Sequence, residues 1–309
     1  MRAPTGTQYP LTFGASSAII TEVAAGLRAL VLDGVEVVQS YPEHSMPPMS
    51  AGIVLVPWPN RIAAGIWALD GVPQLLDVTE RATGNASHGL LRNAPYRLVG
   101  SSASHVTLSA GIHPQHGYPF LLDTEVRYEL TALGLRVTHT VTNLSERAAP
   151  VAVGAHPYLK IGDVPVEMLT LTLDAATYFE VDAAMIPTGE LPVGGTDFDL
   201  RGGRVVSDLR LDHGFGGVAP GVASGESVHS LTAPDGQRVE LYTDESFGFV
   251  QAFTPRIFPT PEGQITAVAI EPMTAPANSF NTGEGLRWLE PAESWSLSWG
   301  IRYVSRVSG

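Results

Sequence analysis

The stretch TEVRYELTALGLRVTHTVTN, Thr124 to Asn143, contains two runs in which apolar and polar residues alternate. Val126 and Tyr128 belong to the first run, and after a short connection Leu135 and Val137 resume the same two-residue period. Successive side chains of a β-strand point to opposite faces of the sheet. The stretch therefore predicts a β-hairpin with one buried face.

Other parts of the chain show similar strand patterns. EMLTLTL (167–173) alternates apolar residues with threonine, and SLTAPDGQRVELYT (230–243) predicts a hairpin that turns at Pro-Asp-Gly. Near the end of the sequence, WSLSWGIRYV places Trp295, Trp299 and Tyr303 on one face of a strand. Helical signals are weak: Ala63 to Leu69, for example, is short and interrupted by glycine.

These patterns predict an all-β fold with many antiparallel strands, too many for one open sheet. We therefore expect two large sheets packed face to face in a single domain over residues 1–309. The segment from Gly214 to Ser227 is rich in glycine and poor in hydrophobic anchors, which predicts a long mobile loop.

The composition limits the partners of the protein. Of the 309 residues, 44% are hydrophobic and 16% are charged, as in a folded chain with a large core. The net charge of −13 and the absence of a Lys/Arg cluster argue against binding of nucleic acid or of an anionic membrane. With no cysteine, no signal-peptide pattern and no long apolar run, we expect a cytoplasmic protein without disulfides.

Common catalytic motifs are missing from the sequence. It contains no P-loop, no G-x-G-x-x-G opening a helix, no G-x-S-x-G elbow and no H-E-x-x-H. HPQH, His113 to His116, has a spacing that could hold a metal ion, but its neighbouring Pro and Gly favour a surface loop. We therefore expect no metal site.

Two charged residues occupy unusual contexts. In VPWPNRIAAGIW (56–67), two prolines stiffen the backbone just before Asn60 and Arg61. Glu271 follows the apolar run 267–270, where a carboxylate is costly unless it is paired or used. Arg61 is a candidate cation to offset that cost, and Pro272 is expected to end the strand.

Further titratable residues adjoin turn-forming residues. His88 precedes a glycine, and His156 precedes a proline that should hold it at the end of a strand. Asp212 and His213 lead into the glycine-rich segment. If these groups converge with Arg61 and Glu271, they suit general acid–base chemistry on a ligand with many hydroxyls. On these features alone, scattered structural polar groups fit equally well.

Several motifs, in this order, resemble the aldose 1-epimerase (galactose mutarotase) family: PWPNRIAAGIW, HGLLR, GYPF, GLRVTHTVTN, AHPYL, LDHGF, EPMTAPANSFNTGEGLRWLEPAESW and SWGIRY. The resemblance extends from about Gly26 to Tyr303. EPMTAPANSF with the later LEPAES is similar to a bacterial subgroup of generic mutarotase-like proteins.

The resemblance implies an antiparallel supersandwich with an open carbohydrate cleft. It also implies that the protein interconverts the α and β anomers of a free hexose without a cofactor. Glu271 falls on the general base of the family and His156 on its general acid. The residues expected to bind the sugar are Arg61, His88, Asp212, Asn60 and Tyr158.

Three alternative functions stay open. A glycosidase would need a second acid matched to Glu271, where the sequence offers a histidine. A non-catalytic carbohydrate-binding protein would not need Glu271 and His156 intact. A mutarotase for an anionic sugar, such as a hexose 6-phosphate or a sulfonated sugar, would need basic residues in the cleft, and Arg92 is a candidate. Exposed edge strands would also permit a homodimer.

Overall fold

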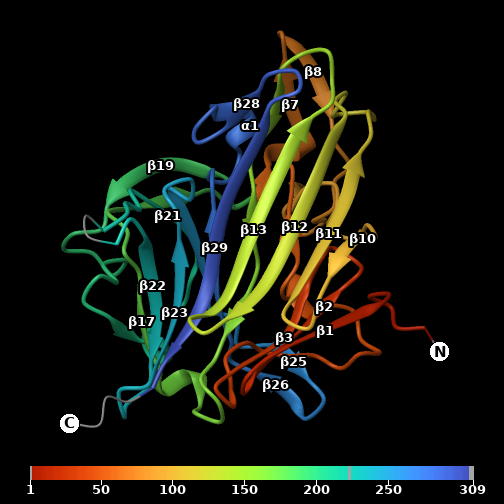
Figure 1. Cartoon of the computed structure of the whole chain (residues 1–309). Helices are drawn as coiled ribbons and strands as arrows, with labels where there is room; N and C mark the ends of the chain where they lie inside the picture. The colour runs from red at the N-terminus through yellow and green to blue at the C-terminus, as the bar shows by residue number, and fades with distance from the viewer. Residues whose placement is uncertain (1, 222–223, 306–309) are drawn as a thin grey trace.

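The computed structural model describes residues 2–221 and 224–305 and consists mainly of antiparallel β-strands (Figure 1). Within these residues, the largest sheet has nine strands and is called the β13 sheet here. In order across the sheet, its strands are β10 (Arg97–Ser101), β11 (His105–Ile112), β12 (Leu122–Thr131), β13 (Gly134–Asn143), β29 (Ser294–Val304), β23 (Arg238–Thr243), β22 (Ser227–Thr232), β17 (Thr170–Thr172) and β20 (Arg204–Val205).

A second large sheet, called the β27 sheet, carries much of the candidate site. Its strands are, in order, β19 (Pro187–Pro192), β18 (Thr177–Val181), β21 (Asp212–Gly216), β24 (Phe249–Phe253), β27 (Val268–Met273), β15 (Gly154–Ala155) and β5 (Val54–Leu55), and β16 (Tyr158–Leu159) also pairs with β27.

Smaller sheets and short helices complete the described chain. One sheet contains β1 (Gln8–Phe13), β2 (Ser16–Thr21), β3 (Leu27–Leu32) and β4 (Val35–Glu36). The two-stranded sheets are β14 (Ala149–Val151) with β28 (Arg287–Leu289), β25 (Phe258–Thr260) with β26 (Gly263–Ile265), β6 (Arg61–Ile62) with β9 (Ala86–Ser87), and β7 (Ile66–Leu69) with β8 (Val72–Leu75). The helical segments are η1 (Pro48–Ser50), η2 (Ala63–Gly65), η3 (Val166–Met168), η4 (Val206–Asp208) and α1 (Ser279–Thr282).

The hairpin predicted from Thr124 to Asn143 is confirmed as β12 and β13. Tyr128 lies opposite Val137 in the register, and both side chains are fully buried. The next strand, β29, pairs with β13 and places Trp299 opposite Val137. The hairpin predicted over 230–243 is confirmed as β22 and β23.

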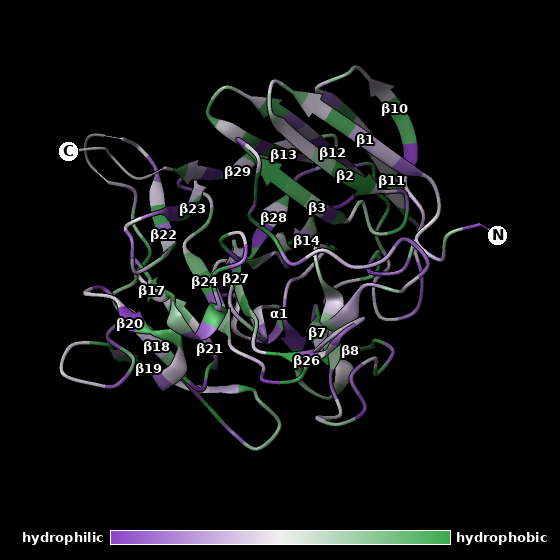
Figure 2. Ribbon diagram, turned by 90° about the horizontal axis from the view of Figure 1, so that it is seen from below, coloured by the Kyte–Doolittle hydropathy of each residue, from purple (hydrophilic) through white to green (hydrophobic). Residues whose placement is uncertain are grey.

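The two large sheets share one hydrophobic cluster. Val137 and Trp299 of the β13 sheet belong to it, together with Val250 and Ile270 of the β27 sheet. Figure 2 shows green, hydrophobic segments along strands of both large sheets. The predicted all-β antiparallel supersandwich is therefore confirmed.

One local prediction was wrong. Strand β27 does not end at Pro272, because Pro272 pairs with Val250 and Met273 with Phe249. In an antiparallel ladder the N–H groups of a strand point alternately to its two neighbours, so one proline removes a donor on one side only.

The loop predicted from Gly214 to Ser227 is shorter in the structure, because both of its ends belong to strands. Gly214 to Gly216 complete strand β21, and Ser227 begins β22. Cross-strand bonding to β24 supplies the order that the glycine-rich sequence does not indicate. Residues 222–223 of the expected loop lie outside the described residues.

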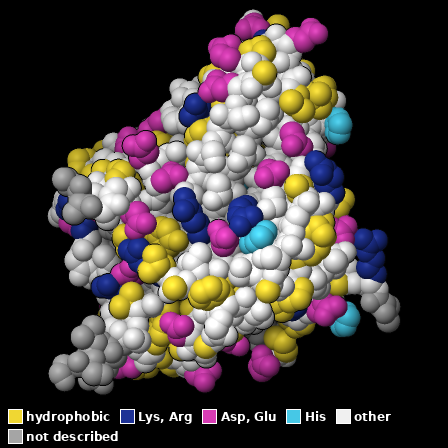
Figure 3. Space-filling model, in the orientation of Figure 1, with side chains coloured by type: hydrophobic (Ala, Val, Ile, Leu, Met, Phe, Trp, Pro, Cys, Tyr) yellow, Lys and Arg dark blue, Asp and Glu magenta, His cyan; other side chains and the backbone are white. Residues whose placement is uncertain are grey.

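The surface carries dispersed charges. On the face drawn in Figure 3, acidic and basic side chains are interspersed, and no continuous basic area is visible. In the part of the chain that the structure describes, no helix has the length and apolar character needed to cross a membrane.

Two histidines in the core predict that stability depends on pH. His139 accepts a hydrogen bond from the Trp299 indole at 2.9 Å, and His229 accepts one from the Asp174 amide at 3.1 Å, so both rings are held neutral. Burial lowers the pKa of His139 to about 3 and that of His229 to about 4. Below the unfolded pKa of about 6.5 only the unfolded chain takes up these protons, which favours unfolding.

We therefore expect the free energy of unfolding to fall by about 1.4 kcal/mol per pH unit for each histidine as the pH drops below 6.5. Urea unfolding at pH 7.5, 6.5 and 5.5 measures this dependence. Equal free energies at the three pH values would contradict neutral, buried imidazoles.

Candidate active site

A cavity of about 290 Å³ opens beside the β27 sheet. Its size lies near the lower end of small-molecule sites, which is about 300 Å³. The structure brings six of the seven predicted site residues together in its lining: Asn60, Arg61, His88, His156, Asp212 and Glu271.

Glu271 and His156 form a buried pair at this cavity. Glu271 lies in β27 opposite Gln251 of β24, and the residue is only 2% exposed. His156 is 5% exposed, and its Nε2 lies 3.4 Å from Oε1 of Glu271. Among the described residues, neither Oε2 of Glu271 nor Nδ1 of His156 has a hydrogen-bond partner. Each member of the pair therefore has one polar atom whose hydrogen bond is left for a ligand.

Burial acts on both members of the pair in favour of their neutral forms. It raises the pKa of Glu271 well above the usual range, and the charge of Asp212 adds to the rise, whereas the charge of Arg61 lowers it. Burial also lowers the pKa of His156 to about 4. In the unliganded cavity these shifts favour a proton on Glu271 over a proton on His156.

The backbone around His156 explains its position. His156 lies between β15 and β16, where its N–H donates to the carbonyl of Ile53 and its carbonyl accepts from Gly52. Gly154 is needed just before it, because a Cβ there would lie 2.9 Å from Pro59. The predicted strand-end position of this histidine is thus confirmed.

Tyr158 supports the His156 ring and does not line the cavity. The two rings stack with their centroids 5.1 Å apart, and the Tyr158 hydroxyl donates to the carbonyl of Met49 at 3.2 Å. The structure thus gives Tyr158 a position behind the imidazole in place of the expected contact with substrate.

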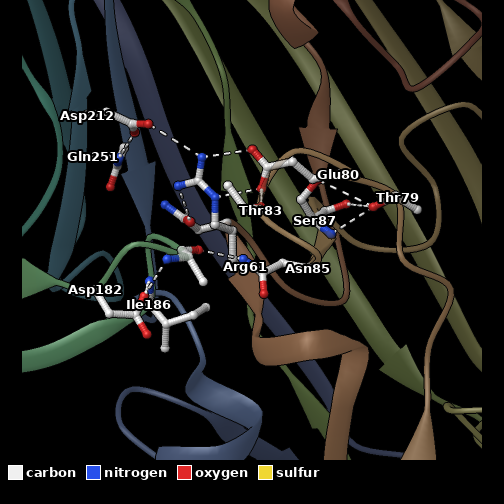
Figure 4. A network of polar contacts seen from close by, with 12 residues as sticks. Arg61, Thr79, Glu80, Thr83, Asn85, Ser87, Asp182, Ile186, Asp212 and Gln251 are labelled. Atoms are coloured by element: carbon white, nitrogen blue, oxygen red, sulfur yellow. Dashed lines mark hydrogen bonds and ion pairs between the residues drawn. The ribbon is translucent and has the colours of Figure 1, made fainter.

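Arg61 is paired with two acids other than Glu271. Its Nε and Nη2 donate to Glu80 at 2.7 and 2.9 Å, and Nη2 lies 3.4 Å from Asp212, as Figure 4 shows. Its charge still lowers the pKa of Glu271, as predicted, but within the described chain no ion pair joins the two side chains directly.

Left-handed backbone presents two of the polar side chains. Asn60 and His88 have φ of +53° and +62°, and the N–H of His88 donates to the carbonyl of Asn60 at 2.9 Å. Gly89 follows His88 where a Cβ would lie 2.0 Å from the carbonyl oxygen of Val56. The HG pair therefore allows the His88 segment to pack against the backbone just before Pro57.

Asp212 is fixed from two sides. It begins β21, one carboxylate oxygen accepts from Nε2 of Gln251 at 2.7 Å, and the other faces Arg61 (Figure 4). His213, which follows it, packs against Phe198 and does not line the cavity.

Glu80 and Gln251 also line the cavity, although neither was predicted from the sequence, and so does Arg92, which was predicted only as a candidate for binding an anion. Gln251 could have been found, because it is a lone polar residue in the apolar strand FVQAF, as Glu271 is in its own strand. Glu80 lies in DVTERATGN, where no periodic pattern distinguishes one acid from another.

The cavity thus combines a buried carboxyl–imidazole pair, a guanidinium and several hydrogen-bonding groups. Across residues 2–221 and 224–305, no cluster of three or more potential metal ligands was found. His116, from the HPQH motif, instead forms a surface hydrogen bond with Asp77 at 3.1 Å.

The family model of aldose 1-epimerase matches residues 7–302. The chain belongs to the aldose 1-epimerase family. It is 32% identical over 300 residues to the uncharacterized protein YihR of Escherichia coli K12, covering 96% of this chain and 93% of YihR. It is also 32% identical to human galactose mutarotase over 170 residues, which cover 50% of this chain and 48% of the human protein.

Solved structures of mutarotase-like proteins share the fold. An aldose epimerase homologue from Caenorhabditis elegans superposes with a TM-score of 0.83 at 19% identity, covering 98% of this chain and all of that one. A putative aldose 1-epimerase from Escherichia coli K12 gives 0.81 at 18% identity, covering 96% of this chain and 99% of that one.

The contacts of Tyr158 generate a stability prediction. Tyr158→Phe removes the hydroxyl that donates to Met49 and should lower the free energy of unfolding by about 1 kcal/mol. Tyr96→Phe is a matched control, since its buried hydroxyl has no partner among the described residues, and should cost nothing. Urea unfolding of both variants tests this, and an equal loss in both would contradict it.

Proposed function

We propose that this member of the family is an aldose 1-epimerase that interconverts the α and β anomers of a free hexose. The observation that carries the proposal is the buried Glu271–His156 pair, whose Oε2 and Nδ1 have no partner in the described chain. The hydrogen-bonding groups around the pair suit the hydroxyls of a sugar ring, and the relatives named mutarotase support the reaction type.

The reaction needs one proton removed and one delivered. A base takes the proton of the anomeric O1 hydroxyl while an acid protonates the ring oxygen O5, and the C1–O5 bond breaks to leave an open-chain aldehyde. Rotation about C1–C2 then exposes the other face of the aldehyde. Closure returns the proton to O1 and takes one back from O5, so the pair ends with the protons it began with.

In this scheme Glu271 acts as the base and His156 as the acid. The pair must therefore hold one proton in total, on the imidazole at the start of ring opening. Burial opposes this ionised form, and the charge of Arg61 favours it by lowering the pKa of Glu271. The total charge of the pair is the same whichever group holds the proton, but only the form with the proton on His156 separates charge, and the guanidinium of Arg61 favours that form.

The chemical demand on the site is modest. Each positioned proton transfer typically contributes about 10²- to 10⁴-fold. Mutarotation already proceeds in water, so two such transfers suffice for a useful rate. Arg61, Asn60, His88, Asp212 and Gln251 would then bind the hydroxyl and ring oxygens and orient the anomeric carbon.

Polarimetry on freshly dissolved α-D-glucose and α-D-galactose tests the proposal. The wild type should accelerate mutarotation over buffer, and Glu271→Gln should lower that acceleration by about 10²- to 10⁴-fold, since the amide cannot accept the O1 proton. Glu36→Gln is the control, because this exposed carboxylate pairs with Lys160 away from the cavity. Binding of either sugar without acceleration would support the non-catalytic alternative instead.

A specific observation favours a second candidate substrate, an anionic sugar. Arg92 lines the same cavity, its Nη1 donates to the Ser87 hydroxyl at 3.0 Å, and its Nε is buried without a partner in the described residues. Burial lowers the pKa of Arg92, and none of the described carboxylates forms an ion pair with it. Such a guanidinium could bind a phosphate or sulfonate substituent of a hexose.

Competition between sugars separates the two candidates. If the substrate is anionic, kcat/KM for a 6-phospho or 6-sulfonated hexose should exceed that for glucose, and Arg92→Gln should reduce this preference by about 10- to 100-fold, the usual size of a lost charge-assisted contact. Nuclear magnetic resonance exchange between the anomers measures both rates. A preference for neutral sugars that Arg92→Gln leaves unchanged would reject the anionic candidate.

A further inference from the structure

Glu80 forms hydrogen bonds along one edge of the Arg61 guanidinium. Nε donates to one carboxylate oxygen at 2.7 Å and Nη2 to the other at 2.9 Å, which is a bidentate pair. The side chains are 14% and 28% exposed, so the pair is partly withdrawn from water. With this edge occupied, Nη1 donates to Asn60 Oδ1 at 3.5 Å, and its second N–H is available to contact a ligand.

Glu80 is itself held in place. Its carboxylate accepts from the Thr83 hydroxyl at 2.7 Å, and its carbonyl accepts from the amides of Gly84 and Asn85. Asn85 is 1% exposed and ties this turn to two other segments, accepting from the Ala64 amide and donating to the Ala184 carbonyl. Figure 4 shows Glu80 and Asp212 on opposite sides of the Arg61 guanidinium. Loose surface ion pairs lack this support.

Besides holding Arg61 in place, Glu80 changes the electrostatic potential in the cavity. Arg61 faces two carboxylates within ion-pair distance, so part of its positive charge is already offset before it acts on Glu271. Without Glu80, a less compensated guanidinium would stabilise the Glu271 carboxylate more strongly and weaken it as a base. The titratable and charged groups that surround Glu271 are His156, His88, Tyr158, Arg61, Arg92, Asp212 and Glu80.

We infer that Glu80 is a positioning residue for the proposed epimerase reaction: it fixes the Arg61 guanidinium in the cavity and offsets its charge, so that Glu271 keeps the basicity the reaction needs. The inference rests on the proposed function for its kinetic consequences. The contact between Glu80 and Arg61, called the clamp below, can be tested without any reaction.

Two variants separate the effect of the charge of Glu80 from the effect of the length of its side chain. Glu80→Gln removes the negative charge, so both limbs of the pH profile of kcat/KM should move down by about 0.5 to 1 in pH, and kcat/KM should fall by about 10- to 100-fold. Glu80→Asp keeps the charge and shortens the side chain, so it should lower kcat/KM with the limbs in place. Asp77→Asn is the control, since it removes an exposed carboxylate three residues away.

A second measurement observes the clamp directly. In a ¹⁵N-correlated spectrum, the Nε–H signal of Arg61, assigned by its loss in Arg61→Lys, should be protected from exchange in the wild type. The protection should disappear in Glu80→Gln and persist in Asp77→Asn. If the wild type shows the protected signal but accelerates no sugar, the clamp stands and the proposed function fails.

The inference is overturned by either of two results. One is a Glu80→Gln variant with wild-type pH limbs and a kcat/KM within about twofold of the wild type. The other is a uniform loss of activity at every pH with unmoved limbs and an intact Arg61 signal, which is what a purely structural role predicts. Shifted limbs in Glu80→Gln with unmoved limbs in Glu80→Asp would establish it.

Discussion

The removal of Glu271 and His156 from water is the constraint on which the rest of the site depends. A carboxyl group and an imidazole lie 3.4 Å apart and are almost completely buried. An isolated buried charge is costly, so the protein must hold the pair neutral or supply compensating charge. It does both, because burial favours one shared proton and Arg61 lies close enough to stabilise the ionised form.

The fold meets this constraint through its sheets. Glu271 sits on a strand whose six residues are all buried, and paired strands on both sides leave it little freedom. Gln251 and Asp212 come from the next strands of the same sheet, so their separation is set by strand spacing. By contrast, Asn60, Glu80 and His88 lie in turns and short strands that pack onto this sheet. Glu271 therefore lies on a rigid strand, whereas several of the polar groups around it come from loops.

Much of the fold could be predicted from the sequence, because alternation in stretches such as Thr124 to Asn143 is a direct record of which face is buried. Residues whose local context conflicted with their charge, such as Glu271, could also be singled out. Pro272 and Gly214 misled because local breaker signals ignore the neighbouring strands that complete the ladder. Glu80 could not be found, since its importance lies in meeting Arg61 from 19 positions away.

A stiff backbone alone does not orient the side chain of Arg61. The prolines before it and the pairing of β6 with β9 fix its main chain, yet a long side chain on a fixed main chain still has several rotamers. The carboxylates of Glu80 and Asp212, with Oδ1 of Asn60, select one of them. Because the two carboxylates are negatively charged, they also reduce the effect of the positive charge of Arg61 on Glu271. The two carboxylates therefore set both the orientation of the Arg61 guanidinium and its electrostatic effect. A change to either of them alters the position of the guanidinium and also the basicity of the buried pair.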